Sequence, residues 1–137
     1  MINITQYLQD IYEDLQRYID NDVCLCKFKE LNFEAGALPD YEDINIQQLY
    51  LLRYAFAYAF EYSRMYLDVL SQMDDVNNIS VISVGCGSMI DYWSLVHALE
   101  MRRKIGCSIR YVGIDKIDWN YKIPKRQNDE VHYLIGN

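Results

Sequence analysis

The feature that most constrains the fold is a strand signal that runs straight into a glycine turn and then into a helix signal. Residues 79–84 form a β-branched run, which predicts a strand buried on both faces. The run ends at Gly85-Cys86-Gly87-Ser88, and apolar spacing then predicts a helix over residues 89–104 that Gly106 ends. A second strand is expected over residues 108–115. A strand-helix-strand unit of this length implies a parallel pair joined by a right-handed crossover.

The remaining segments fit around this unit. Apolar residues at three- and four-residue steps predict a helix over residues 4–19, capped by Asn3 or Thr5, and a long helix over residues 45–73. The long helix is apolar on most of its circumference, so we expect it to pack on the sheet on one side and on a helix or another chain on the other. Residues 131–135 predict a third strand.

The pattern therefore predicts an α/β chain in which N-terminal helices precede the first strands of a Rossmann-like parallel sheet. We place a helical region that packs on the sheet at residues 1–78. The β-α-β unit and the third strand occupy residues 79–137.

Composition narrows the function classes. The net charge of −7 disfavours binding to a phosphate backbone, and the basic cluster near Lys122, Lys125 and Arg126 is interpreted as a solvated loop. No secretory leader or membrane-spanning run is present, so we expect a cytoplasmic protein without a membrane partner. The four cysteines lack the spacing of a zinc site and are expected to be reduced thiols, with no metal bound. The 13 tyrosines suit half-buried faces and interfaces, and the aromatic run at residues 54–60 favours core packing over a ligand site.

The glycine turn carries the candidate chemistry. A parallel strand brings the chain to the carboxyl edge of the sheet, where Gly85 and Gly87 let the backbone approach a ligand. The following helix points its free N–H groups at the same place. Asp115, at the end of the next strand, is placed to accept the hydroxyl groups of a ribose.

This arrangement resembles the cofactor site of class I S-adenosylmethionine (SAM)-dependent methyltransferases over residues 79–118. Gly85-Cys86-Gly87-Ser88 matches the glycine-rich loop of that family, and Asp115 matches its ribose-binding acid. The resemblance implies that Lys116 and Ile117 lie against the adenine edge. For Asp91 two roles are expected: a contact with the methionine amino group, or that of an acid in the first helical turn. The implied cofactor is SAM or S-adenosylhomocysteine.

The sequence also departs from the family pattern. Ser83 stands where the strand usually ends in an acid, and Met89 stands where a third glycine often falls. The dinucleotide fingerprint G-x-G-x-x-G/A fits less well, because its sixth position is Ile90. Neither histidine, His97 or His132, stands out as a general base, so no catalytic residue is assigned.

Two functions follow as expectations. The first is the SAM-binding portion of a SAM-dependent methyltransferase with an unassigned acceptor, and with too few strands for a catalytically complete core. The alternative is a non-catalytic Rossmann-like interaction or sensor module. In either case the third strand presents an unpaired edge, which predicts a homo-oligomer or a partner chain that covers it.

Overall fold

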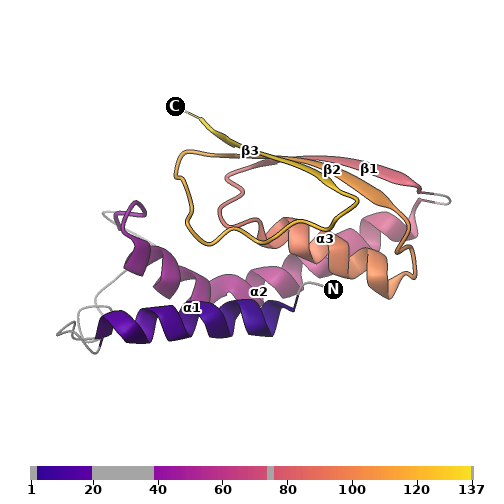
Figure 1. Ribbon diagram of the computed structural model, residues 1–137. Coiled ribbons are helices and arrows are strands. Elements are labelled where there is room, and N and C mark those ends of the chain that lie inside the picture. Colours follow the sequence, from indigo (N-terminus) through magenta and orange to yellow (C-terminus); the bar gives the residue numbers. More distant parts are fainter. Residues whose placement is uncertain (1–2, 20–38, 74–75, 137) are drawn as a thin grey trace.

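The computed structural model describes residues 3–19, 39–73 and 76–136, which form helices and a three-stranded parallel sheet (Figure 1). In chain order the elements are α1 (Ile4–Ile19), α2 (Ile44–Ser71), β1 (Asn78–Val84), α3 (Ile90–Met101), β2 (Ser108–Asp115) and β3 (Glu130–Ile135). The α/β class and the parallel pairing expected from the sequence are confirmed.

The sheet has the strand order β1-β2-β3, so β2 is central and β1 and β3 are its two edges. The strands are aligned with Val81 opposite Tyr111 and Tyr111 opposite Val131. All three helices lie on one side of the sheet (Figure 1). The carboxyl ends of β1 and β2 therefore meet at one corner of the sheet, above the helical layer.

The opposite face of the sheet is uncovered in the described part of the chain. Exposure alternates along β1, and the outward side chains of Ile82 and Val84 are 75% and 82% exposed. The expectation that residues 79–84 form a strand buried on both faces is therefore wrong. Its physical reason is that helices cover one face only, and a β-branched run suits a half-buried strand as well as a buried one.

α3 is the centre of the core, because it lies between the sheet and α2 (Figure 1), and its Tyr92 ring lies 5.4 Å from the ring of Tyr111 on β2. Its residues Tyr92, Leu95 and Leu99 are almost fully buried. The helix ends earlier than expected, in a Schellman motif. Arg103 adopts the left-handed φ of 56° and donates its N–H to Glu100 O at 2.9 Å, while the next N–H bonds Leu99 O at 2.8 Å. The residue that ends the helix is thus Arg103, and the assignment of that role to Gly106 is wrong.

The N-terminal helices form the outer layer, with α1 packed on α2 and α2 packed on α3. Asn3 caps α1, since its side-chain oxygen accepts the N–H groups of Thr5 and Gln6 at 3.0 and 3.2 Å. Two aromatic side chains of α2 point into solvent, because Phe56 and Phe60 are 57% and 70% exposed. The expectation that the aromatic run at residues 54–60 packs in the core is therefore wrong for these two rings.

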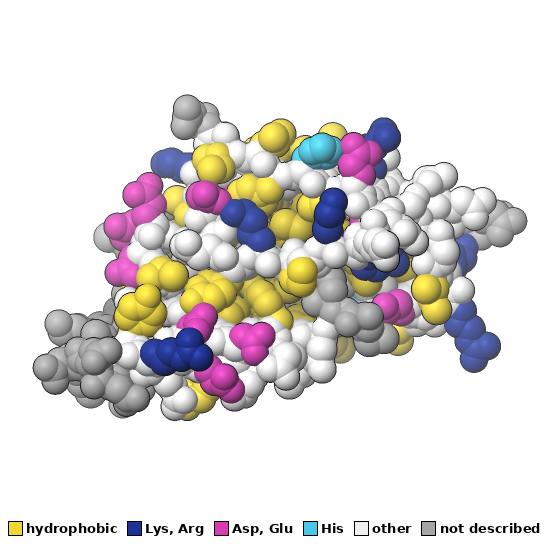
Figure 2. Space-filling model, viewed as in Figure 1, with side chains coloured by type: hydrophobic (Ala, Val, Ile, Leu, Met, Phe, Trp, Pro, Cys, Tyr) yellow, Lys and Arg dark blue, Asp and Glu magenta, His cyan; other side chains and the backbone are white. Residues whose placement is uncertain are grey.

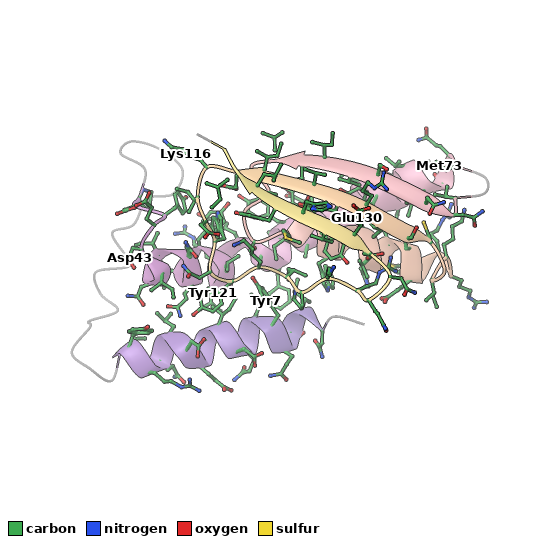
Figure 3. The ribbon with its side chains drawn as sticks, turned by 45° about the horizontal axis from the view of Figure 1, so that its top comes forward. Tyr7, Asp43, Met73, Lys116, Tyr121 and Glu130 are labelled. Atoms are coloured by element: carbon green, nitrogen blue, oxygen red, sulfur yellow. The ribbon has the colours of Figure 1, made fainter. Side chains whose placement is uncertain are left out.

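A segment without helix, residues 116–129, connects β2 to β3 and is fixed by polar side chains. The hydroxyl of Tyr7 on α1 donates to the carbonyl of Tyr121 at 2.6 Å, and the two residues lie side by side in Figure 3. Gln47 Oε1 accepts the N–H of Asn120 at 2.8 Å. Arg126, whose side chain is 17% exposed, pairs with the fully buried side chain of Asp129. The interpretation of the basic cluster as a solvated loop is therefore wrong for Arg126.

Charges of both signs are interspersed over the face of the molecule seen in Figure 2. Among the described helices, none has both the length and the apolar character that crossing a membrane requires.

Candidate ligand cavity

A cavity of about 710 Å³ lies where β1 ends. Its walls are the last residues of β1, the glycine turn, the start of α3, the residues after β2 and one side of α2. Seven of the eight site residues predicted from the sequence line it, namely Gly85, Cys86, Gly87, Ser88, Asp91, Asp115 and Ile117. The eighth, Lys116, is exposed at the end of the sheet and does not line the cavity (Figure 3).

The turn between β1 and α3 depends on left-handed backbone. Gly85 and Gly87 have φ values of 71° and 53°, which a residue with a side chain rarely adopts. Met89 also has a φ of 68° and forms the N-cap of α3 without a side-chain hydrogen bond to the helix. The turn is fastened to the sheet by the N–H of Gly85, which donates to Ile114 O at 2.7 Å. The backbone of the turn thus forms the floor of the cavity.

Asp115 connects the glycine turn to the end of β2. One carboxyl oxygen accepts the N–H of Gly87 at 2.7 Å, and the other accepts the N–H of Ile117 at 2.9 Å. Residues 28 positions apart in the chain are therefore in direct contact. Because a carboxylate oxygen has more than one acceptor site, Asp115 retains capacity for further hydrogen bonds from a ligand.

Asp91 is a second acidic group on the same cavity. It lies in the first turn of α3 and is 8% exposed. The hydroxyl of Tyr111 lies 2.9 and 3.1 Å from its two carboxyl oxygens. Burial and then the neighbouring Asp91 raise the pKa of Tyr111, so this phenol keeps its proton and serves as a donor.

Cys86 and Ser88 hold the turn against the rest of the fold. A Cβ on Gly113 of β2 would lie 2.7 Å from Cys86 Sγ, so a glycine at this position gives the thiol its space. Burial, and after it Asp115 and Asp91, raise the pKa of Cys86 to about 11. Cys86 is therefore a protonated packing group at neutral pH and not a nucleophile. The carbonyl of Ser88 accepts the N–H of Ile123 at 2.9 Å.

A row of tyrosines on α2 forms a further wall of the cavity, which was not predicted from the sequence. Tyr50, Tyr58, Tyr62 and Tyr66 all line the cavity. The centroid of the Tyr58 ring lies 6.2 Å from that of Tyr50 and 6.1 Å from that of Tyr62. The signal was present as tyrosine at every fourth position from residue 50 to residue 66, which places the rings on one side of a helix.

The charge of Asp91 acts on two of these tyrosines. Burial, and after it the charge of Asp91, raise the pKa values of Tyr62 and Tyr66. These phenols accordingly keep their protons near neutral pH. They present aromatic faces and O–H donors to the cavity and provide no general base.

The electrostatic character of the cavity favours a positively charged ligand. Its described lining contains two acids, Asp91 and Asp115, and no lysine, arginine or histidine. Aromatic faces and carboxylates both attract cations, whereas a phosphate would find no cationic side chain among these residues. Within the described ranges, no group of three or more His, Cys, Asp or Glu side chains is arranged to hold a metal ion.

No protein-family model matches this chain, and comparison with curated proteins and with solved structures gives no significant match.

Proposed function

We propose that this chain binds SAM in the cavity at the end of β1, as the cofactor-binding portion of a class I methyltransferase-like protein. The observation that carries the proposal is that one cavity gathers a glycine turn and two acids. Gly85 and Gly87 form its floor, and Asp91 and Asp115 lie on its walls with no cationic side chain beside them in the described lining.

The ribose, the two positive groups and the base of SAM each have a suitable group in this arrangement. The ribose hydroxyls are donors, and Asp115 offers acceptor positions beside the glycine turn. The ligand carries two positive groups, an ammonium and a sulfonium. Asp91 suits the ammonium, and the faces of Tyr58 and Tyr62 suit the sulfonium. Ile117 offers an apolar surface for the base.

In methyl transfer, SAM supplies the methyl group and the acceptor supplies the electron pair. The contribution of these residues is to bind and orient the sulfonium. Tyr62 and Tyr66 retain their protons because their pKa values are raised, so they would orient an acceptor through hydrogen bonds and would not deprotonate it.

A dinucleotide is the less suitable ligand. Its pyrophosphate requires positive potential, and no lysine, arginine or histidine is found among the described residues that line the cavity. Ile90, at the sixth position of the fingerprint, is 6% exposed and has a bulky side chain where that fingerprint needs glycine or alanine.

Isothermal titration calorimetry with SAM, S-adenosylhomocysteine and NAD tests the proposal. We expect SAM to bind and NAD to bind far more weakly. Asp115→Ala should weaken SAM binding by about 1–3 kcal/mol, which corresponds to roughly 5- to 150-fold, because the ribose hydroxyls lose their acceptor. Asp118→Ala is the matched control, since it removes an acid three residues further on that does not line the cavity.

Thermal unfolding of both variants, with and without ligand, separates a lost contact from a disturbed turn, because a bound ligand stabilises only a competent site. Absence of SAM binding by the unaltered chain would contradict the proposal. An equal loss of affinity in Asp118→Ala would assign the effect to overall charge and not to the site.

A further inference from the structure

Two tyrosines buried in the core each donate a hydrogen bond to an acid, at opposite ends of β2. Tyr92 and Tyr111 are both 0% exposed, and their rings meet edge to face with centroids 5.4 Å apart. The hydroxyl of Tyr92 donates to Asp129, which also pairs with Arg126. The hydroxyl of Tyr111 donates to Asp91, which lines the cavity. Of these two tyrosines, Tyr111 is therefore the one that connects the core with the candidate ligand site.

The ring of Tyr111 reaches Asp91 by lying over Gly113. Residues 111 and 113 share one face of β2, because side chains alternate along a strand. A Cβ at Gly113 would lie 2.9 Å from Cε1 of the Tyr111 ring and 2.7 Å from Cys86 Sγ, which is closer than such atoms approach one another in proteins. Gly113 thus leaves the space across which the phenol extends to the first turn of α3, where Asp91 lies.

The contact with Tyr111 orients the carboxylate of Asp91. The hydroxyl lies 2.9 and 3.1 Å from the two carboxyl oxygens, and Tyr111 is the one donor to Asp91 among the described contacts. The phenol keeps its proton, because burial and then the charge of Asp91 raise its pKa by more than a hydrogen bond with Ser83 lowers it. A carboxylate held in this way loses little freedom when a ligand binds, and its other acceptor positions stay open.

We propose that Tyr111 is a positioning residue that holds the Asp91 carboxylate toward the ammonium group of the ligand. The inference rests on the proposed function and deepens it by naming a specificity: the cavity favours adenosine ligands that carry an amino acid over those that carry none. Hydrogen bonds between an ammonium and a carboxylate are stronger than neutral ones, so this contact can supply the preference. Tyr111 does not line the cavity itself and therefore acts through Asp91.

Calorimetry with two ligands tests the proposal. S-adenosylhomocysteine carries the amino acid, whereas 5′-methylthioadenosine keeps the base and the ribose and lacks the amino acid. In Tyr111→Phe we expect the affinity for S-adenosylhomocysteine to fall about 10-fold and the affinity for 5′-methylthioadenosine to stay unchanged, because the phenyl ring preserves the packing and only the donor is lost. Tyr92→Phe is the matched control, since it removes an equally buried hydroxyl that donates to Asp129. It should alter the affinity for neither ligand.

A double-mutant cycle shows whether the effect passes through Asp91. In a chain that already carries Asp91→Asn, adding Tyr111→Phe should no longer change the affinity for S-adenosylhomocysteine, because the carboxylate that the hydroxyl orients is gone. This comparison holds even where Tyr111→Phe alone is too unstable to titrate, since the double variant has no buried charge left without a donor at this position. Circular dichroism establishes that each variant is folded.

Equal losses of affinity for the two ligands in Tyr111→Phe would overturn the inference, because the hydroxyl would then only support the fold. So would an unchanged affinity for S-adenosylhomocysteine, or a loss that persists in the presence of Asp91→Asn. Failure of the unaltered chain to bind either ligand would overturn the proposed function together with this inference, so the two failures are distinguishable.

Discussion

The two ends of β2 hold buried acids in opposite electrostatic settings. At the amino-terminal end, Asp129 accepts two hydrogen bonds from Arg126, at 2.7 and 2.8 Å. It also accepts the Tyr92 hydroxyl at 2.6 Å and the N–H of Ile109 at 3.0 Å. At the carboxyl-terminal end, Asp91 faces a cavity whose described lining contains no cationic side chain.

The difference separates an acid that supports the fold from one available to a ligand. The charge of Asp129 is compensated by a guanidinium and four hydrogen bonds, so it ties the segment before β3 to the start of β2. Asp91 has one protein donor, Tyr111, within the described contacts. A buried acid with no cationic side chain beside it in the described lining is available to a positively charged ligand. We therefore expect substitutions around Asp129 to alter stability and substitutions at Asp91 to alter ligand binding.

The largest expected effect is on stability, from Arg126→Met. This change leaves Asp129 buried without its cation, which should lower the free energy of unfolding by about 3–5 kcal/mol. Urea denaturation followed by circular dichroism measures it. The affinity for SAM, measured where the variant is still folded, should not change.

Arg110→Met provides the control for that prediction. Arg110 also pairs with an acid, Glu130, at 2.8 Å, but the two side chains are 68% and 51% exposed. Exposed pairs contribute little to stability, so this variant should unfold almost as the unaltered chain does. Equal losses in Arg110→Met and Arg126→Met would break the comparison, because burial would then not decide what an ion pair contributes.

The opposite outcome is expected for Asp91→Asn. The amide oxygen can still accept from Tyr111, so the free energy of unfolding should change by less than about 1 kcal/mol. Affinity for both SAM and S-adenosylhomocysteine should fall about 10- to 100-fold, because both ligands carry the ammonium group. Calorimetry gives the affinities, and the exposed Asp68→Asn on α2 controls for net charge. A large loss of stability with unchanged affinity would place Asp91 with the structural acids.

The site could be predicted from sequence where its signal was local. The strand, glycine turn and helix follow one another within a few residues, and a parallel sheet brings the end of the next strand to the same corner. Asp115 therefore lies next to Gly87 and accepts its N–H, at the place that the turn and strand pattern implied. Lys116 did not join the site, because the residue after Asp115 faces out of the sheet toward solvent.

What could not be predicted depends on packing between distant segments. The tyrosine row of α2 is visible in the sequence, but nothing local shows that this face of the helix meets the end of β1. The pairing of Arg126 with Asp129 was missed because a charged pair three residues apart looks the same in a solvated loop as in a buried one. The exposed face of β1 was missed because β-branched residues fit both one-sided and two-sided burial.

The smallest expected effect is the dependence of stability on pH through Asp129. Burial acts to raise the pKa of this carboxyl, but hydrogen bonds from Arg126, Tyr92 and Ile109 outweigh it and hold the pKa below its ordinary value. The folded form therefore binds fewer protons than the unfolded chain. The stabilisation is fully present above the unfolded pKa of about 3.9 and is lost as the pH falls through the lower folded value.

Asp129→Asn should accordingly unfold with a shallower pH dependence than the unaltered chain below about pH 4. The measurement is a series of urea titrations at high salt. Salt screens the exposed Glu130, whose pKa is lowered by hydrogen bonds from His132 and Arg110, but it acts much less on the buried Asp129. Glu130→Gln should then match the unaltered chain at every pH. Identical pH profiles for Asp129→Asn and the unaltered chain would show that Asp129 is not held as a charged group, and the contrast between the two ends of β2 would rest on hydrogen bonding alone.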